Sequence, residues 1–338
     1  QMVAALSVGN TVVAKPAEQT SLCAAKVVEL FYHAGLPEDA LQLVPGKGDV
    51  VGSQLVAHPD VAGVMFTGST QTAKLIQRQL ADKEGPIVPL IAETGGMNAM
   101  IADSSALIEQ LVKDVVHSAF GSAGQRCSAL RVLFVQDDIA EKVIDMLKGA
   151  MHMLEVGMPK WIATDLGPVI DSDALQMLRQ HETDMQGKGE LLCQLKLPGN
   201  LSGNYFPPQL YELDDFSLLK KEVFGPVLHV VRFRRKDLDN VIDQINASGY
   251  GLTFGIHSRI NSTIEHIQKR IRVGNVYVNR NMIGAVVGLQ PFGGCGLSGT
   301  GPKAGGPHYL AHLCREMVVS VDTTASGGNA SLMALGDD

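Results

Sequence analysis

The chain has 338 residues, of which 45% are hydrophobic and 19% are charged, and its formal net charge is −7. This composition is typical of a soluble protein of roughly two domains, and the negative charge argues against nucleic acid or an anionic membrane as the main partner. No apolar run reaches the roughly 20 residues of a membrane span. Five scattered cysteines do not suggest a disulfide framework, so we expect a reducing, cytoplasmic setting.

The first hundred residues alternate strand-like and helix-like segments. Strands are predicted at 11–15, 40–44, 61–66 and 87–92, and helices at 20–34, 48–57 and 70–80. Ser69 or Thr70 would cap the third helix. This alternation indicates a parallel α/β sheet.

A second α/β region begins at about Asn98. Strands are predicted at 97–101, 132–136, 228–232, 255–257 and 274–279, with helices at 105–120 and 139–153, further helices in the later gaps, and a loop at 196–206. A strand-like run at 317–321 precedes a Gly/Ala/Ser-rich end. The whole chain therefore reads as an α/β protein.

Cys127 is the candidate nucleophile. Gly124 precedes it closely, Arg126 and Arg131 flank it, and a helix-like segment lies upstream. Nearby positive charge and free backbone N–H groups would lower the pKa of the thiol, and the N–H of Cys127 itself is a candidate donor to an oxyanion. The alternative is a cysteine that acts only as a small buried apolar residue.

Glu93 is the candidate base. It follows the apolar run 87–92 and precedes Gly95 and Gly96. The end of a buried parallel strand is where α/β sheets place active sites, and burial there would raise the pKa of the carboxyl and suit it to activating water. A surface carboxylate is the alternative. A thiol with a carboxylate fits the formation and hydrolysis of a thioester, which converts an aldehyde to an acid.

Two segments are candidates for binding a dinucleotide. Lys15 and Glu18 follow the first strand and could hold a ribose, and a carboxylate there favours NAD over NADP; a solvated ion pair is the alternative. Gly68 and Ser69 join a strand to a helix, whose N-terminus could face a pyrophosphate. Helix capping explains Ser69 equally well.

Two other patterns are rejected as sites. The segment 294–299 fits G-x-G-x-x-G but lacks the strand–turn–helix context of a dinucleotide-binding turn. His308 and His312 stand four apart without an acidic residue that completes a metal-binding pattern. We therefore expect no metal.

Several motifs occur in a characteristic order along the chain. They are Lys15 with Glu18, Gly68-Ser69, Glu93-Thr94-Gly95-Gly96, Gly124-Gln125-Arg126-Cys127, Glu222-Val223-Phe224-Gly225-Pro226 and Pro291-Phe292-Gly293-Gly294. Together they resemble the aldehyde dehydrogenase superfamily over essentially the whole chain. The stretches 14–20, 127–131, 277–281 and 298–307 are most similar to the L-glutamate γ-semialdehyde (1-pyrroline-5-carboxylate) dehydrogenase branch, in the version found as a C-terminal module of bifunctional proline utilisation proteins.

The resemblance implies a fold with three parts. Residues 1–95 would be the C-terminal part of a Rossmann-type NAD-binding domain, 96–310 the catalytic domain, and 311–338 an oligomerisation strand and tail. The Asn that donates to the oxyanion in the family would fall before Gln1, so we expect an incomplete module with little or no activity by itself. A proline dehydrogenase module upstream and a homo-oligomer are also implied.

The resemblance also implies roles for individual residues. Cys127 would be the nucleophile and Glu93 the base for hydrolytic water, while Glu222 would bind the nicotinamide ribose and Phe224 would pack near the nicotinamide. The adenosine half of NAD would lie on Lys15, Glu18, Gly68 and Ser69.

In the semialdehyde branch, Ser128 and the backbone of Gly284 and Ala285 would anchor the substrate carboxylate, and Phe292 would line the aldehyde tunnel. Two alternatives stay open. One is a broad aliphatic aldehyde dehydrogenase, which needs no carboxylate anchor, and the other is a non-catalytic oligomerisation fragment.

Overall fold

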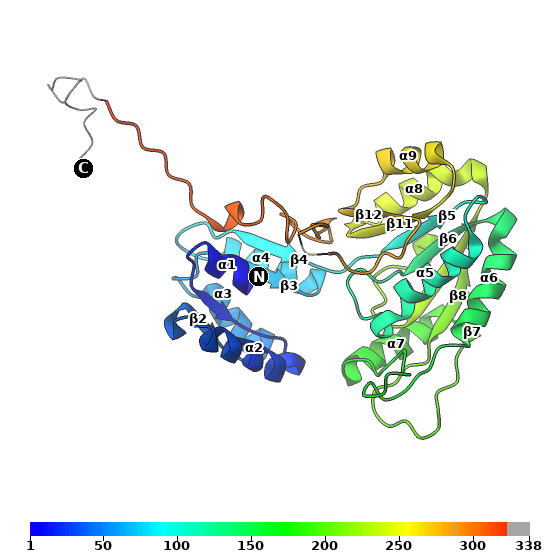
Figure 1. Ribbon diagram of the computed structural model, residues 1–338, viewed down its shortest axis with the longest axis horizontal. Helices are drawn as coiled ribbons and strands as arrows, with labels where there is room; N and C mark the ends of the chain where they lie inside the picture. Colours follow the sequence, from blue (N-terminus) through cyan, green and yellow to red (C-terminus); the bar gives the residue numbers. More distant parts are fainter. Residues whose placement is uncertain (287, 323–338) are drawn as a thin grey trace.

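The computed structural model describes residues 1–286 and 288–322, and they form two lobes joined by several chain segments (Figure 1). The first lobe holds residues 1–95, and the second, which we call the sheet lobe, is built on a seven-stranded sheet. The chain then returns to the first lobe. Thr300 Oγ1 accepts a hydrogen bond from the Ala92 N–H at 2.9 Å, and Asn10 Nδ2 donates to the Leu313 carbonyl at 2.9 Å. The end of the predicted catalytic segment and the start of the predicted tail thus pack against the first lobe.

The first lobe confirms the predicted alternation of strands and helices. Its elements are α1 (Met2–Ser7), β1 (Val12–Ala14), α2 (Ser21–His33), β2 (Leu41–Leu43), a π-helical turn (Gly48–Gly52), α3 (Ser53–Ala57), β3 (Val64–Thr67), α4 (Thr70–Ala81) and β4 (Leu90–Glu93). β1 pairs with β2 and β3 pairs with β4, both in parallel. Among the described residues these are two separate two-stranded sheets, which bury little apolar surface.

The sheet lobe has the strand order β12-β11-β5-β6-β9-β8-β7. Its strands are β5 (Ala99–Ala102), β6 (Val132–Gln136), β7 (Glu190–Gln194), β8 (Gln209–Leu213), β9 (Val227–Phe233), β11 (Thr253–His257) and β12 (Asn275–Val278), and its helices are α5 (Ile108–Phe120), α6 (Asp137–Met151), α7 (Ser172–Met185), α8 (Leu238–Ala247) and α9 (Asn261–Arg270). Every pair is parallel except β7 with β8. β7 and β8 lie in parts of the chain where no strand is predicted from the sequence. A short antiparallel pair, β10 (Tyr250–Gly251) with β13 (Cys295–Gly296), lies outside this sheet.

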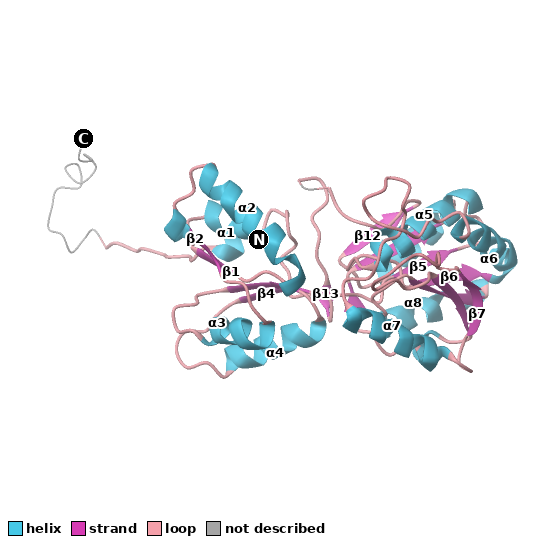
Figure 2. Ribbon diagram, turned by 90° about the horizontal axis from the view of Figure 1, so that it is seen from below, coloured by secondary structure: helices cyan, strands magenta, loops and turns pink. Residues whose placement is uncertain are grey.

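Helices cover both faces of this sheet, with α5 and α6 on one face and α7 and α8 on the other (Figure 2). Successive residues of β6 show the consequence. Leu133 and Val135 pack in the cluster under α5 and α6, whereas Val132 and Phe134 pack in the opposite cluster. A strand buried on both faces becomes a continuous apolar run, which is why the sequence predicted β6 accurately. None of the described helices is long and apolar enough to span a membrane.

The strand predicted at 317–321 is not formed within the described chain, and its pairing with a second copy stays a prediction. These residues have no secondary structure and extend away from the first lobe as an arm (Figure 1). Its large apolar side chains are exposed: Met317, Val318, Val319 and Val321. A strand needs a pairing partner, and no segment of the described chain pairs with the arm. The rest of the predicted tail, 323–338, lies outside the described residues.

Candidate active site

Glu93 is the last residue of β4, where it pairs with Thr67 of β3. Its Oε2 accepts a hydrogen bond from the Gly294 N–H at 3.2 Å, and its buried Oε1 has no hydrogen-bond partner among the described residues. Burial raises the pKa of Glu93 to about 7, although the Gly294 N–H and the charge of Lys303 oppose this shift. The carboxyl is therefore poised to exchange a proton near neutral pH.

Glycines from the segment 293–299 enclose this carboxyl. A Cβ on Gly293 would lie 2.8 Å from Glu93 Oε1, and a Cβ on Gly299 would lie 2.8 Å from the Ala92 carbonyl oxygen. The G-x-G-x-x-G pattern rejected as a dinucleotide-binding turn thus provides close backbone contact to the candidate base. Sequence reasoning missed this contact because 200 positions separate Glu93 from Gly293 (293 minus 93).

Cys127 lies in a strained turn after α5. Ser122 and Ala123 have φ values of 57° and 53°, and Gly124 has a φ of 67°. This left-handed conformation is costly for residues with a side chain, and such strain often accompanies active sites. At Gly124 a side chain is excluded, because a Cβ would lie 2.0 Å from the Gly225 carbonyl oxygen.

The predicted lowering of the Cys127 pKa is wrong. Burial raises the pKa of the thiol, and the negative charges of Glu222 and Glu93 raise it further, while the N–H groups of Ser128 and Cys127 oppose the shift. The positive charge expected from Arg131 is neutralised by Glu222. The thiol consequently needs a base to become a nucleophile.

Arg131 connects the cysteine turn to the segment that carries Glu222. Its side chain is 2% exposed, and its Nη2 contacts Glu222 Oε1 at 2.9 Å. Nη1 donates to the Gly124 carbonyl at 2.6 Å and to the Gly225 carbonyl at 3.4 Å, and Nη2 donates to the Arg126 carbonyl at 3.1 Å. Only a guanidinium offers this many donors in one plane. From the sequence alone, Arg131 is predicted to act only as a nearby positive charge.

Two further side chains contact Arg131, and a third side chain contacts one of these two. The guanidinium lies 5.1 Å from the centre of the Phe224 ring. His229 Nδ1 lies 3.0 Å from the Arg131 carbonyl oxygen, and His229 Nε2 lies 3.0 Å from His181 Nε2. Burial lowers the pKa of His229 to about 3 and that of His181 to about 4, so both rings are neutral at pH 7. Arg131 is therefore held from both its side chain and its backbone.

Lys15 and Glu18 lie together beyond the end of β1, as predicted. Lys15 Nζ is 3.5 Å from Glu18 Oε1, and it donates to the Gly46 carbonyl at 3.1 Å. Glu18 Oε1 also accepts from the Gly48 N–H at 2.8 Å. The N–H of Glu18 itself, with the Gly48 N–H and Lys15, lowers the pKa of Glu18, so the carboxylate is ionised at neutral pH.

Ser69 caps α4, since its Oγ accepts from the Thr72 N–H at 3.1 Å. The preceding Gly68 donates its N–H to the Glu93 carbonyl at 3.1 Å. The N-terminus of α4 and Glu93 thus lie at the same edge of the β3–β4 pair. Glu222 approaches this edge as well, because a Cβ on Gly95 would lie 1.8 Å from Glu222 Oε2.

Two of the predicted substrate-binding groups lie together. Ser128 is 3% exposed, and its Oγ accepts from the Gly284 N–H at 3.4 Å. Ala285 follows in the same loop. Phe292 lies elsewhere in the chain's return toward the first lobe, where its N–H donates to the Ala304 carbonyl at 3.0 Å.

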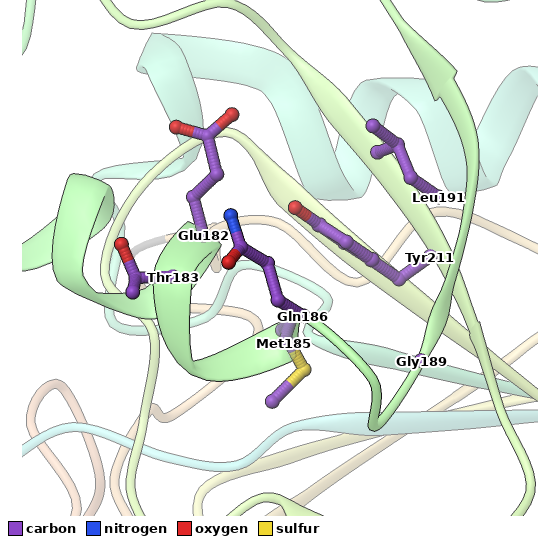
Figure 3. Close-up of a pocket in the computed structure, with 7 residues that line it drawn as sticks. All are labelled: Glu182, Thr183, Met185, Gln186, Gly189, Leu191 and Tyr211. Carbon is purple, nitrogen blue, oxygen red and sulfur yellow. The ribbon is translucent and has the colours of Figure 1, made fainter.

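A separate pocket of about 240 Å³ lies at the β7 edge of the sheet, between α7 and the β7–β8 pair (Figure 3). Its lining residues are Glu182, Thr183, Met185, Gln186, Gly189, Leu191 and Tyr211. None of them belongs to the predicted constellation. Within the described ranges, no three His, Cys, Asp or Glu residues are grouped so that they could hold a metal ion.

The chain is similar to known proteins over most of its length. The model of the aldehyde dehydrogenase family matches residues 1–319. The chain belongs to this family. The chain is 57% identical over 322 residues to the bifunctional protein PutA of Salmonella typhimurium. The alignment covers 93% of this chain and 24% of that protein. It is also 37% identical over 324 residues to the 1-pyrroline-5-carboxylate dehydrogenase of Geobacillus thermodenitrificans. That alignment covers 94% of this chain and 62% of the dehydrogenase.

Solved structures of this family show the same fold. A crystal structure of bifunctional proline utilization A matches with a TM-score of 0.93 and 57% identity, covering 97% of this chain and 33% of that chain. The 1-pyrroline-5-carboxylate dehydrogenase from Thermus, solved with bound NAD, matches with a TM-score of 0.87 and 35% identity. This match covers 92% of the present chain and 60% of the Thermus chain. The chain thus spans about a quarter of the length of the Salmonella PutA protein and less than two thirds of the length of the Geobacillus dehydrogenase.

Proposed function

We propose that these residues catalyse the NAD-dependent oxidation of L-glutamate γ-semialdehyde to L-glutamate. The observation that carries the proposal is the position of Ser128, one residue from Cys127, with its buried Oγ next to the Gly284 N–H. A hydroxyl beside backbone N–H groups suits a carboxylate, which L-glutamate γ-semialdehyde has and an aliphatic aldehyde lacks. The names and identities of the relatives support the same substrate class.

The chemistry assigns one role to each side chain at the centre. Once the thiol proton has passed to solvent water, Cys127 Sγ attacks the aldehyde carbon, and a C–S bond forms to give a thiohemiacetal. The Cys127 N–H is placed to donate to the oxyanion. NAD held by Glu222 and Phe224 would supply the hydride acceptor for this oxidation, whose product would be a thioester on Cys127. Glu93 then takes a proton from water as the water attacks the thioester carbon, and the C–S bond breaks to release L-glutamate.

The residues of this chain fit NAD. Glu18 is ionised and partly exposed beside Lys15, as a partner for ribose hydroxyls should be, and the N-terminus of α4 at Gly68 and Ser69 suits a pyrophosphate. Glu222 would take the nicotinamide ribose. Arg131 contacts one carboxyl oxygen of Glu222 and would fix its orientation.

The whole protein is proposed to assemble further. The four exposed apolar side chains of the arm, at 317, 318, 319 and 321, suit a strand that pairs with a second copy of the chain. From the likeness to bifunctional PutA we also propose a cytoplasmic protein with a proline dehydrogenase module on the same polypeptide.

The test compares NADH formation from L-glutamate γ-semialdehyde and from pentanal, an uncharged aldehyde of the same chain length, in the full-length protein. We expect a strong preference for the acidic substrate, and Ser128→Ala should reduce that preference without affecting pentanal. Equal rates for the two aldehydes would indicate a broad aliphatic aldehyde dehydrogenase. No NADH from either would favour a non-catalytic assembly role.

A further inference from the structure

We infer that one polar face of α5, together with Tyr277, positions the loop whose backbone would anchor the substrate carboxylate. This loop, residues 279–286, follows β12 and is called the anchor loop here. The inference rests on the proposed function and adds residues that set its specificity. These are positioning residues, because they would act through the loop and touch no reacting atom.

The polar face of α5 consists of Gln110, Asp114 and Ser118. They are four residues apart, so they lie in one row along the helix. Gln110 Nε2 donates to the Asn279 carbonyl at 2.6 Å, at the first residue of the anchor loop. Ser118 Oγ, which is fully buried, accepts from the Met282 N–H at 3.2 Å. The two ends of the row thus hold two points of the loop.

The middle of the row lies near a third point of the loop, with a histidine between them. Asp114 Oδ2 lies 3.6 Å from Nε2 of His257, which is 1% exposed. The backbone of Arg280 hydrogen-bonds to the His257 ring. Residues 279, 280 and 282 of the loop therefore follow Gln110, Asp114 and Ser118 in the same order. Gln110 and Ser118 thus satisfy backbone polar groups of the loop, whereas Asp114 Oδ2 and His257 Nε2 have no hydrogen-bond partner among the described residues.

Tyr277 holds the loop at the proposed anchor itself. Its buried hydroxyl donates to the Gly284 carbonyl at 3.1 Å, and the Gly284 N–H donates to Ser128 Oγ at 3.4 Å. Gly284 has a φ of 69° and Asn279 a φ of 50°, so the loop has a defined left-handed backbone at both residues. Both backbone polar groups of Gly284 are thereby fixed in direction.

Fixed direction matters because backbone N–H groups cannot adjust to a ligand as side chains do. A preorganised donor stabilises a carboxylate without the cost of ordering it during binding. Releasing the Gly284 carbonyl should let the peptide groups of the loop rotate. Recognition of the carboxylate should then weaken, while the reaction at Cys127 should not change.

The experiment is Tyr277→Phe in the full-length protein, which removes one hydroxyl. The matched control is Tyr205→Phe, since Tyr205 is also buried and donates to a backbone carbonyl, that of Gly157, at 3.2 Å. We expect Tyr277→Phe to raise KM for L-glutamate γ-semialdehyde roughly three- to tenfold and to weaken L-glutamate binding by a similar factor, as expected for one lost hydrogen bond. Its kcat/KM for pentanal should stay unchanged, and Tyr205→Phe should alter none of these values.

Other outcomes would overturn the inference. Equal KM values for Tyr277→Phe and Tyr205→Phe would do so, and the proposed function would survive if the wild type still preferred the acidic aldehyde. A parallel loss with both aldehydes would show a general structural role instead. If the wild type has no preference, the proposed function fails and the inference fails with it. Should Tyr277→Phe not fold, Ser118→Ala gives the same test.

Discussion

The two lobes differ in how firmly they hold their functional residues. In the sheet lobe, strands such as β6 are buried on both faces, and the two apolar clusters are large. In the first lobe few apolar side chains are buried, and Leu22 and Ile87 are 89% and 100% exposed. Since burial of apolar surface supplies most of the stability, the sheet lobe should be the rigid part and the first lobe the compliant one.

The functional residues are divided between the lobes accordingly. The nucleophile and the proposed substrate anchor lie in the sheet lobe, whereas Lys15, Glu18 and Ser69 lie in the first lobe. Glu93 lies where the two lobes meet, because it ends β4 and is enclosed by glycines of the segment 293–299. Within this chain, the nucleophile therefore has more buried apolar structure around it than the residues proposed to hold the cofactor.

The largest expected effect is the loss of the nucleophile. Cys127→Ser should lower NADH formation at least about 10⁴-fold, because a hydroxyl loses its proton far less readily than a thiol and is a much weaker nucleophile. The melting temperature should barely change, since the substitution removes no core contact. Cys314→Ser, at an exposed cysteine, is the control and should keep full activity. Retained turnover in Cys127→Ser would show that another group carries the reaction.

Glu93→Gln should lower the rate of thioester hydrolysis about 10²–10⁴-fold. In the wild type, hydrolysis should increase as the pH rises through about 7, because only the ionised carboxyl accepts a proton from water. Stopped-flow measurement of acyl-enzyme decay against pH tests both points. A pH-independent decay would exclude Glu93 as the base.

Glu93 should also destabilise the fold at high pH. Its pKa is raised from 4.5 to about 7 in the folded chain, so ionisation costs folding free energy as the pH rises between these values. Glu93→Gln should therefore leave the free energy of unfolding unchanged at pH 4 and increase it at pH 8. The gain should be about 1 kcal/mol, because the side chain is only partly buried.

Two substitutions that shorten a leucine side chain test whether the sheet lobe is packed more firmly than the first lobe. Leu133→Ala removes a side chain with no exposed surface in the sheet lobe and should cost about 2–5 kcal/mol of unfolding free energy. Leu22→Ala on the exposed side of α2 should change it by less than about 0.5 kcal/mol. Urea denaturation measures both. Similar costs at the two positions would mean that the first lobe is packed as firmly as the sheet lobe.

Arg131→Lys should reduce kcat about tenfold although the charge is kept, because an ammonium cannot hold Glu222 and three carbonyl groups at once. Arg126→Lys is the matched control. The Arg126 side chain contacts the Ser122 hydroxyl at 2.9 Å, so its replacement should be nearly neutral. If the two variants behave alike, the fork geometry of Arg131 is not needed.

The smallest expected effect lies in the first lobe. Glu18→Gln should raise KM for NAD a few-fold and reduce discrimination against NADP, since it removes the charge that would repel a 2′-phosphate. Glu29→Gln, which breaks an exposed ion pair with Lys26 on α2, should change neither value. An unchanged NADP/NAD ratio in Glu18→Gln would remove this carboxylate from the cofactor site.

Those parts of the site that depend on residues close together in the sequence were predictable. Glu93 at a strand end, Lys15 beside Glu18 and the Ser69 cap depend on residues within a few positions of one another, and the structure has all three arrangements. The Cys127 pKa was not predictable in this way. The expected effect of Arg131 was cancelled by Glu222, which is 91 positions further along the chain.

The sequence by itself determined the α/β architecture, because apolar runs and turn residues encode strands and helices locally. It also determined the family, through short motifs around Glu93, Cys127 and Glu222. Only the tertiary structure decided which groups face one another: the glycines around Glu93, the contacts of Arg131, and the row on α5 against the anchor loop. These contacts depend on packing between distant segments, where one neighbour's charge or carbonyl decides what a side chain can do.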